Sequence, residues 1–248
     1  ALALADFITK TGLAAIPEPA LRAGKRGLLD CLGTALGGAQ SPAAKMALDL
    51  IAEAGGNAQA TLLAQSKRAP VRDAALFNAT AAHALDFDDT LSSPAAMVGL
   101  AVAEQQKLPG SELLRSYVLG FEVASRMAHA IGGWENTRGW HMMGVAGVFG
   151  AAATASVLLA LNPQQLVVAL GLAATQAAGL VAMHGFLAKP FHSGKAAANG
   201  LFSAQLALRG CTTGPALEGV MSVSQAMGGS PTPDLAQSLG ESYAVLGN

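Results

Sequence analysis

Small apolar residues recur at helical spacing through nearly the whole of this chain, and this pattern restricts its possible folds more than any other feature. Hydrophobic residues make up 52% of the 248 residues, aromatic residues only 5%, and glycine occurs 29 times. A large core built from small side chains requires helices that pack closely together. Strands alternating with helices are not visible, so we predict an all-α fold with one helical domain over residues 1–248.

Proline and glycine mark the boundaries of the expected helices. Pro17 and Pro19 precede a leucine-rich run that ends at Gly37–Gly38, and Ser41–Pro42 begins a helix that reaches about Ala54. Further helices are expected over residues 71–86, from an N-cap at Ser111, over 163–183, over 194–209 and from Gly214–Pro215, with one short strand at 60–64.

The composition argues against several classes of protein. A formal net charge of −1 without a basic run argues against a nucleic-acid partner. Cys31 and Cys211 are too few for a disulfide framework or a zinc motif, which favours a cytoplasmic protein. The first residues contain neither a basic region nor a long apolar stretch, so no signal peptide is expected.

Two long apolar stretches, residues 144–161 and 165–183, raise the alternative of a membrane-spanning pair of helices. Both are rich in alanine, glycine and threonine, and Gln176 interrupts the second. Aromatic belts and flanking basic residues are missing from both. A buried helical hairpin is therefore the favoured interpretation, and we expect no membrane association.

Three carboxylates and an imidazole gather in the octapeptide His83–Thr90, although only 12% of the chain is charged. Burying such a cluster is costly unless something is bound or paired there. On a continuing helix Asp86 and Asp89 share a face, and His83 lies one turn earlier, where it could orient Asp86. The cluster is therefore either a catalytic or substrate-binding group, or a set of helix-end charges satisfied by Thr90 and the backbone.

A second candidate residue, His141, stands just before a helix whose first turns carry Gly144, Gly147 and Gly150. Glycines at this spacing let another backbone or a ligand come close, and a helix N-terminus favours an anion. A neutral imidazole at this point could move protons near a bound carboxylate. The alternative is a core histidine beside glycines that serve helix packing.

A third candidate, Lys189, precedes Pro190, which favours extended backbone rather than helix for the lysine. Its ammonium could hold a substrate carboxylate or stabilise an enediolate. His192 and Lys195 flank the start of the next helix. The alternative is a solvated loop lysine. Gly194–Lys195 does not form a phosphate-binding loop, because the glycine-rich run and the strand before it are missing.

Taken together and in this order, these patches resemble the 2-methylcitrate dehydratase family, also called MmgE/PrpD, whose relatives include cis-aconitate decarboxylases and an iminodisuccinate epimerase. One departure is that relatives usually carry a His-Pro pair shortly after the acidic motif, where this chain has Leu91-Ser92-Ser93-Pro94. The matching stretches are residues 82–90, 120–126, 139–141 with 147–153, and 189–194, with further likeness at 28–33 and 210–219.

The resemblance implies a large all-helical domain and a smaller α+β lid, usually in a homodimer without metal or other cofactor. Residues after about 228 would lead toward a lid domain that is not present in this sequence. By resemblance, Asp86, His141 and Lys189 are catalytic, whereas Thr90 and His192 bind the substrate. The implied substrate is a small polycarboxylate.

The implied reaction is that of a lyase, namely dehydration or decarboxylation next to a carboxylate, and an epimerase remains possible. Two alternatives stay open. A non-catalytic helical paralogue that serves dimerisation or binding would turn over no tricarboxylate. A magnesium-dependent isoprenoid-type synthase is suggested by Asp86-Phe87-Asp88-Asp89 on an all-α scaffold, but it needs a second metal-binding motif and an aromatic cavity, which the sequence does not show.

Overall fold

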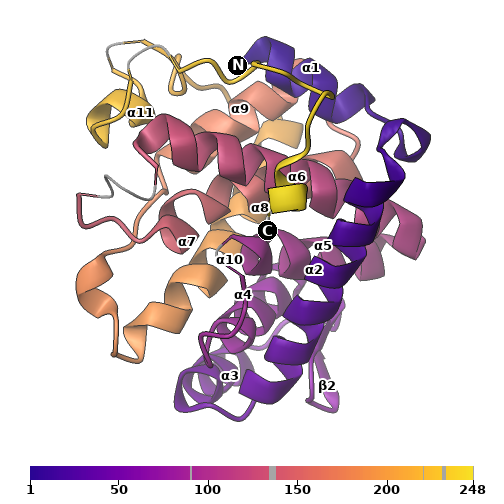
Figure 1. Ribbon diagram of the computed structural model, residues 1–248. Helices are drawn as coiled ribbons and strands as arrows, with labels where there is room; N and C mark the ends of the chain where they lie inside the picture. Colours follow the sequence, from indigo (N-terminus) through magenta and orange to yellow (C-terminus); the bar gives the residue numbers. More distant parts are fainter. Residues whose placement is uncertain (90, 134–137, 220, 231–232, 248) are drawn as a thin grey trace.

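The computed structural model describes residues 1–89, 91–133, 138–219, 221–230 and 233–247, and these residues are predominantly helical (Figure 1). The prediction of an all-α fold is therefore confirmed. The elements in chain order are α1 (Leu2–Lys10), α2 (Glu18–Gly38), α3 (Pro42–Ala54), β1 (Ala60–Leu62), β2 (Lys67–Ala69), α4 (Val71–Ala82), α5 (Ser92–Gln106), α6 (Gly110–Ile131), α7 (Met142–Val145), α8 (Gly147–Leu158), α9 (Pro163–Ala174), α10 (Ala188–Leu208) and α11 (Val223–Ala226), with 3-10 turns at Leu13–Ala15, Val181–Met183 and Ala244–Gly247.

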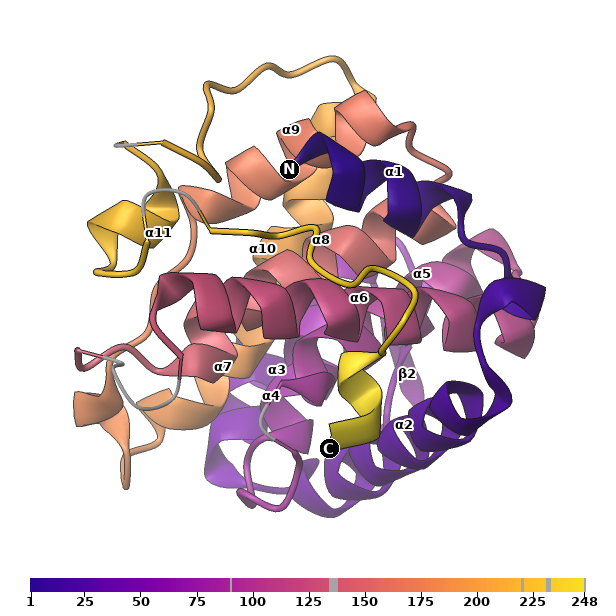
Figure 2. The same cartoon turned by 45° about the horizontal axis from the view of Figure 1, so that its top comes forward.

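Helix α8 forms the centre of the fold. All of its residues are buried, and α5, α6, α9 and α10 pack around it (Figure 2). Its sequence, GVFGAAATASVL, is apolar on every side, as expected of a helix surrounded by other helices. The apolar stretch before Asn162 is thus a core element, and no helix among the described residues is long and apolar enough to cross a bilayer.

Several expected boundaries agree with the structure and others do not. α2 and α3 begin and end close to the predicted residues, and Asn162 caps α9 through a reciprocal pair of hydrogen bonds with Gln165. The helix expected from Pro163 to Met183 stops at Ala174. The N-cap of α6 is Pro109 rather than Ser111. A second short strand, β2, pairs antiparallel with β1 and was not predicted.

Two corrections matter for the candidate site. The helix expected to reach Asp86 ends at Ala82, and the acidic motif lies in a loop. Lys189, expected in extended backbone, lies inside α10, which begins at Ala188. Pro190 falls in the first turn of that helix, where backbone N–H groups have no intrahelical partner, so the proline is tolerated there. α10 therefore carries Lys189 and His192 on one continuous helix.

Because α8 and α10 pack closely, one added methyl group at their contact should lower the stability of the protein. A Cβ on Gly200 of α10 would lie 2.7 Å from the backbone nitrogen of Ala152 and 2.8 Å from the carbonyl oxygen of Val148. Backbone atoms of a buried helix cannot yield cheaply, so we expect Gly200→Ala to lower the free energy of unfolding by about 1–3 kcal/mol. Urea unfolding followed by circular dichroism measures this change.

Gly33 in the interior of α2 provides the matched control, because a Cβ there meets nothing within 4 Å. Gly33→Ala should raise the free energy of unfolding by roughly 0.5–1 kcal/mol through the better helix propensity of alanine. Equal effects of the same sign in the two variants would show that the α8–α10 contact is not as tight as described.

Candidate functional site

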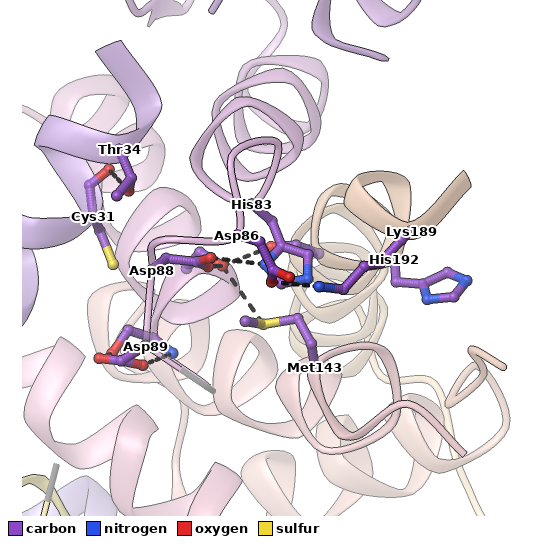
Figure 3. A network of polar contacts seen from close by, with 12 residues as sticks. Cys31, Thr34, His83, Asp86, Asp88, Asp89, Met143, Lys189 and His192 are labelled. Atoms are coloured by element: carbon purple, nitrogen blue, oxygen red, sulfur yellow. Dashed lines mark hydrogen bonds and ion pairs between the residues drawn. The ribbon is translucent and has the colours of Figure 1, made fainter. Parts of the chain in front are cut away.

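The loop after α4 turns its aspartates in different directions (Figure 3). Asp86 has a φ of 58°, in the left-handed region. Aspartate tolerates this region better than most residues, because its short side chain can hydrogen-bond locally. The prediction that Asp86 and Asp89 share one face of a helix is therefore wrong.

Asp88 points into the protein and takes the histidine contact that was expected for Asp86. Its side chain is fully buried, its Oδ1 lies 2.8 Å from Nδ1 of His83, and its Oδ2 accepts a 2.7 Å hydrogen bond from Oγ of Ser93. Oγ of Ser93 in turn lies 2.8 Å from Oγ of Ser193 on α10. This chain of contacts joins the loop, α5 and α10.

Asp89 serves the start of α5. Its Oδ1 accepts hydrogen bonds of 3.0 Å and 2.8 Å from the backbone N–H groups of Leu91 and Ser92. The hydroxyl of Ser92 lies 2.6 Å from that of Tyr117, whose pKa is raised chiefly by burial. A carboxylate that accepts hydrogen bonds from free N–H groups at a helix start stabilises the helix, so we interpret Asp89 as a cap.

Asp86 and Lys189 meet in an ion pair, with Nζ of the lysine donating to Oδ1 of the aspartate. This hydrogen bond is the main reason that the pKa of Asp86 is lowered. The side chain of Lys189 is only 12% exposed, whereas that of Asp86 is 68% exposed. Two predicted catalytic residues that are 103 positions apart in sequence therefore lie together near the surface.

Four of the five histidines of the chain gather beside this ion pair, and we call them the histidine cluster: His83, His141, His184 and His192. His141 lies at its centre. Its ring centroid is 5.5 Å from that of His83 in a stacked arrangement, 4.9 Å from that of His184 edge-on, and 5.2 Å from that of His192. Lys189 is close enough to act electrostatically on His141.

A single hydrogen joins His141 to His192, because their Nδ1 atoms lie 2.9 Å apart and one must accept what the other donates. Burial lowers the pKa of His141 to about 3, and positive charge on His83 and His192 adds to this effect. Burial also lowers the pKa of His192. At neutral pH His141 is therefore an uncharged imidazole, the form that can accept a proton.

The lowered pKa of His141 has a consequence for stability. In the unfolded chain this imidazole takes up a proton near pH 6.5, whereas in the folded protein it stays neutral down to about pH 3. The unfolded state thus binds more protons in this window, and the free energy of unfolding falls as the pH drops. We expect a loss of about 1–2 kcal/mol between roughly pH 7 and pH 4.5, after allowing for partial exposure of the ring.

Urea midpoints measured across this pH range check the expectation. In His141→Asn the decline should be shallower than in the unaltered protein, because the group that takes up the proton is gone. Identical declines in the two proteins would show that His141 contributes nothing to the acid sensitivity.

Two hollows adjoin these segments. One, of about 280 Å³, lies at the acidic loop and is lined in part by Asp30, Asp88 and Asp89. The other, of about 370 Å³, is an apolar groove in which Leu187 and Phe191 of the α10 region face α3. His141 lines neither hollow, and the exposed members of the site are Asp86 and His184, whereas His141 and Lys189 are partly buried.

The structure thus brings together Asp86, His141, Lys189 and His192, whereas Thr90 lies outside the described residues. Sequence reasoning missed Asp88 as the partner of His83, and it missed His184 and the two serines, Ser93 and Ser193. A signal for His184 was available, because a chain with only five histidines in 248 residues makes each of them a candidate. The serines carried no such signal.

Comparisons with known proteins identify the family of this chain. The family described as the MmgE/PrpD N-terminal domain matches residues 2–236, so the chain belongs to the MmgE/PrpD family. The cis-aconitate decarboxylase-like protein oryM of Aspergillus oryzae is 32% identical over 84% of this chain and 46% of its own length. Human cis-aconitate decarboxylase is 31% identical over 79% of this chain and 43% of its own length.

A third relative, cis-aconitate decarboxylase of Aspergillus terreus, is 38% identical over a shorter stretch, 44% of this chain and 23% of that protein. The chain therefore spans less than half the length of these curated relatives. The expectation of an MmgE/PrpD helical domain is confirmed.

Proposed function

We propose that this chain supplies the acid–base face of a lyase that removes water or CO₂ from a small polycarboxylate. The observation that carries the proposal is the convergence of Asp86, His141 and Lys189 from three separate segments. The names of the relatives, which are cis-aconitate decarboxylases, support the same substrate class and favour decarboxylation. They also favour a lyase over an isoprenoid-type synthase.

The residue types fit the chemical demand of such a reaction. Removing a proton, or CO₂, next to a carboxylate leaves an electron pair on carbon that is delocalised as an enediolate. The ammonium of Lys189 stabilises the developing negative charge, and the mostly buried position of this lysine strengthens that effect. Dehydration further requires a base for the proton on carbon, which is the neutral ring of His141, and a proton for the departing hydroxyl, which the ammonium of Lys189 supplies so that water leaves.

Decarboxylation differs in its proton requirement. The carbon–carbon bond breaks, the electron pair stays on the substrate, and a proton must then be delivered to carbon. The ammonium of Lys189 is the proposed proton source for this step. His192 and Thr90 are proposed to contact the substrate. The homodimer and the cytoplasmic location remain predictions.

A substrate panel tests the proposed function. The purified protein is incubated with cis-aconitate and with hydroxylated tricarboxylates, and products are followed by proton NMR and by CO₂ release. We expect turnover of at least one of these acids, with CO₂ released from cis-aconitate. The absence of turnover of every acid at high protein concentration would favour the non-catalytic paralogue.

A further inference from the structure

The buried pair of His83 and Asp88 is not used by the chemistry proposed above. The side chain of His83 is 5% exposed and that of Asp88 is fully buried. Burying a carboxylate is expensive unless hydrogen-bond donors or a positive charge compensate for the lost water. The pair joins Asp88 to the histidine cluster, since the ring of His83 stacks on that of His141 at a centroid distance of 5.5 Å.

The hydrogen bonds around Asp88 are consistent with an ionised carboxylate. Ser93 donates its only hydroxyl hydrogen to Oδ2 of Asp88, so the hydroxyl of Ser193 must donate to Ser93. His83 presents Nδ1 to the other carboxylate oxygen. Every hydrogen bond in this series is then donated toward Asp88. An ionised carboxylate requires this, because it can only accept hydrogen bonds.

This arrangement fixes the tautomer of His83. Because Nδ1–H donates to Asp88, the nitrogen that remains to take up a proton is Nε2. Among the described residues Nε2 of His83 is buried and has no hydrogen-bond partner. An unsatisfied buried nitrogen is unfavourable for stability, which suggests that it is kept for another reason.

Charged and titratable groups from several elements face His83 or the rings beside it. Asp88 and Asp86 come from its own loop, Lys189 and His192 from α10, His141 from the residue before α7, and His184 from the segment before α10. Asp86 is already paired with Lys189. Within the described part of the chain, His83 is the cluster histidine with a carboxylate at hydrogen-bond distance, so it is the ring on which a positive charge is best compensated.

We propose that Asp88 and His83 form a positioning pair that takes up a proton before His141 does and thereby keeps His141 neutral and able to accept a proton. A positive charge on His83, stacked on His141, disfavours a second charge on the central ring. The contact with His192 also disfavours a charged His141. The two Nδ1 atoms share one hydrogen, and there is no room between them for the second hydrogen that a charged His141 would bring if His192 kept its own. The role in catalysis rests on the proposed function, whereas the order of protonation does not.

The order of protonation can be measured in the unaltered protein. Imidazole nitrogens are labelled with ¹⁵N, assigned with single His→Gln variants, and titrated by NMR from about pH 8 to about pH 2.5, so that the titration passes through the midpoint of His141. We expect His83 to show the Nδ1–H tautomer and to become protonated before His141. Protonation of His141 before His83, or the Nε2–H tautomer at His83, would overturn the proposal.

Two variants test the coupling. Asp88→Asn removes the charge that favours a proton on His83, and His83→Gln removes the ring itself. In each folded variant we expect the protonation midpoint of His141 to rise by about one pH unit or more. Asp49→Asn is the control, because Asp49 is an exposed residue of α3 and no described contact joins it to the acidic loop or to the cluster. An unchanged midpoint of His141 in folded His83→Gln would contradict the coupling.

Activity separates this proposal from the function on which it rests. If turnover is found, the acidic limb of the kcat/KM profile should move to higher pH in His83→Gln by the same shift seen by NMR, while Asp49→Asn should leave it in place. If no acid is turned over but His83 is protonated first, the proposed function fails and the pair stands. If turnover is found without the shift, the pair fails alone.

Discussion

His141→Asn should lower kcat/KM for the substrate by about 10²–10⁴-fold while leaving the helical fold intact, because general acid–base groups contribute rate enhancements of that size. Asparagine is the informative replacement. Its amide lies near the position of Nδ1, so it can keep the 2.9 Å contact with His192 while it removes the ring that takes up protons. Steady-state kinetics together with far-ultraviolet circular dichroism measure both quantities.

His129→Asn serves as the matched control for His141. His129 is the one histidine outside the cluster; it lies on α6, where its Nδ1 is 2.7 Å from the carbonyl oxygen of Ser125. We expect its replacement to leave kcat/KM within about twofold, because it touches no group of the candidate site. Equal losses in the two variants, or normal turnover in His141→Asn, would place the chemistry elsewhere.

Lys189→Met should lower kcat by about 10²–10³-fold, because it removes the ammonium that stabilises the enediolate while keeping a side chain of similar length. Asp86→Asn should also lower kcat. Asparagine is a suitable replacement, because it tolerates the left-handed backbone at this position as aspartate does. Because the two groups form one ion pair, the double variant should lose much less than the product of the single losses.

Stability separates this expectation from a structural role of the ion pair. Asp86 is 68% exposed, and exposed pairs contribute only about 0–1 kcal/mol to the free energy of unfolding. The three variants should therefore unfold at nearly the same urea concentration as the unaltered protein. Losses of activity that are accompanied by large losses of stability, or that multiply in the double variant, would contradict a shared catalytic role.

Much of the fold could be predicted from the sequence, because its signals are local. The prolines before α2 and after Ser41, and the reciprocal cap at Asn162, act on neighbouring backbone and place helix ends near the observed residues. The predicted ends of α4 and α9 lie several residues beyond the observed ends, since alanine-rich sequence continues past both. Helix propensity alone does not determine where these two helices stop, because tertiary context routinely overrides it.

The candidate site could be predicted only in part, because some of its contacts depend on the tertiary structure. The sequence indicated Asp86, His141 and Lys189, and the structure brings them together. It did not indicate which aspartate faces inward, because the left-handed backbone at Asp86 reverses the orientation expected from a helix. The contacts from Ser93 to Asp88 and to Ser193 depend on how α5 packs on α10, a relation between residues 100 positions apart that no local pattern encodes.

A crystal structure with a bound tricarboxylate inhibitor tests the central claim most directly. We expect one carboxylate of the inhibitor within hydrogen-bond distance of Nζ of Lys189 and the reacting carbon beside the ring of His141. Another hollow, of about 540 Å³, is lined in part by Arg126 and His129 near the C-terminal end of α6 and offers the competing location. An inhibitor seated there, with Asp86, His141 and Lys189 uncontacted, would contradict the account.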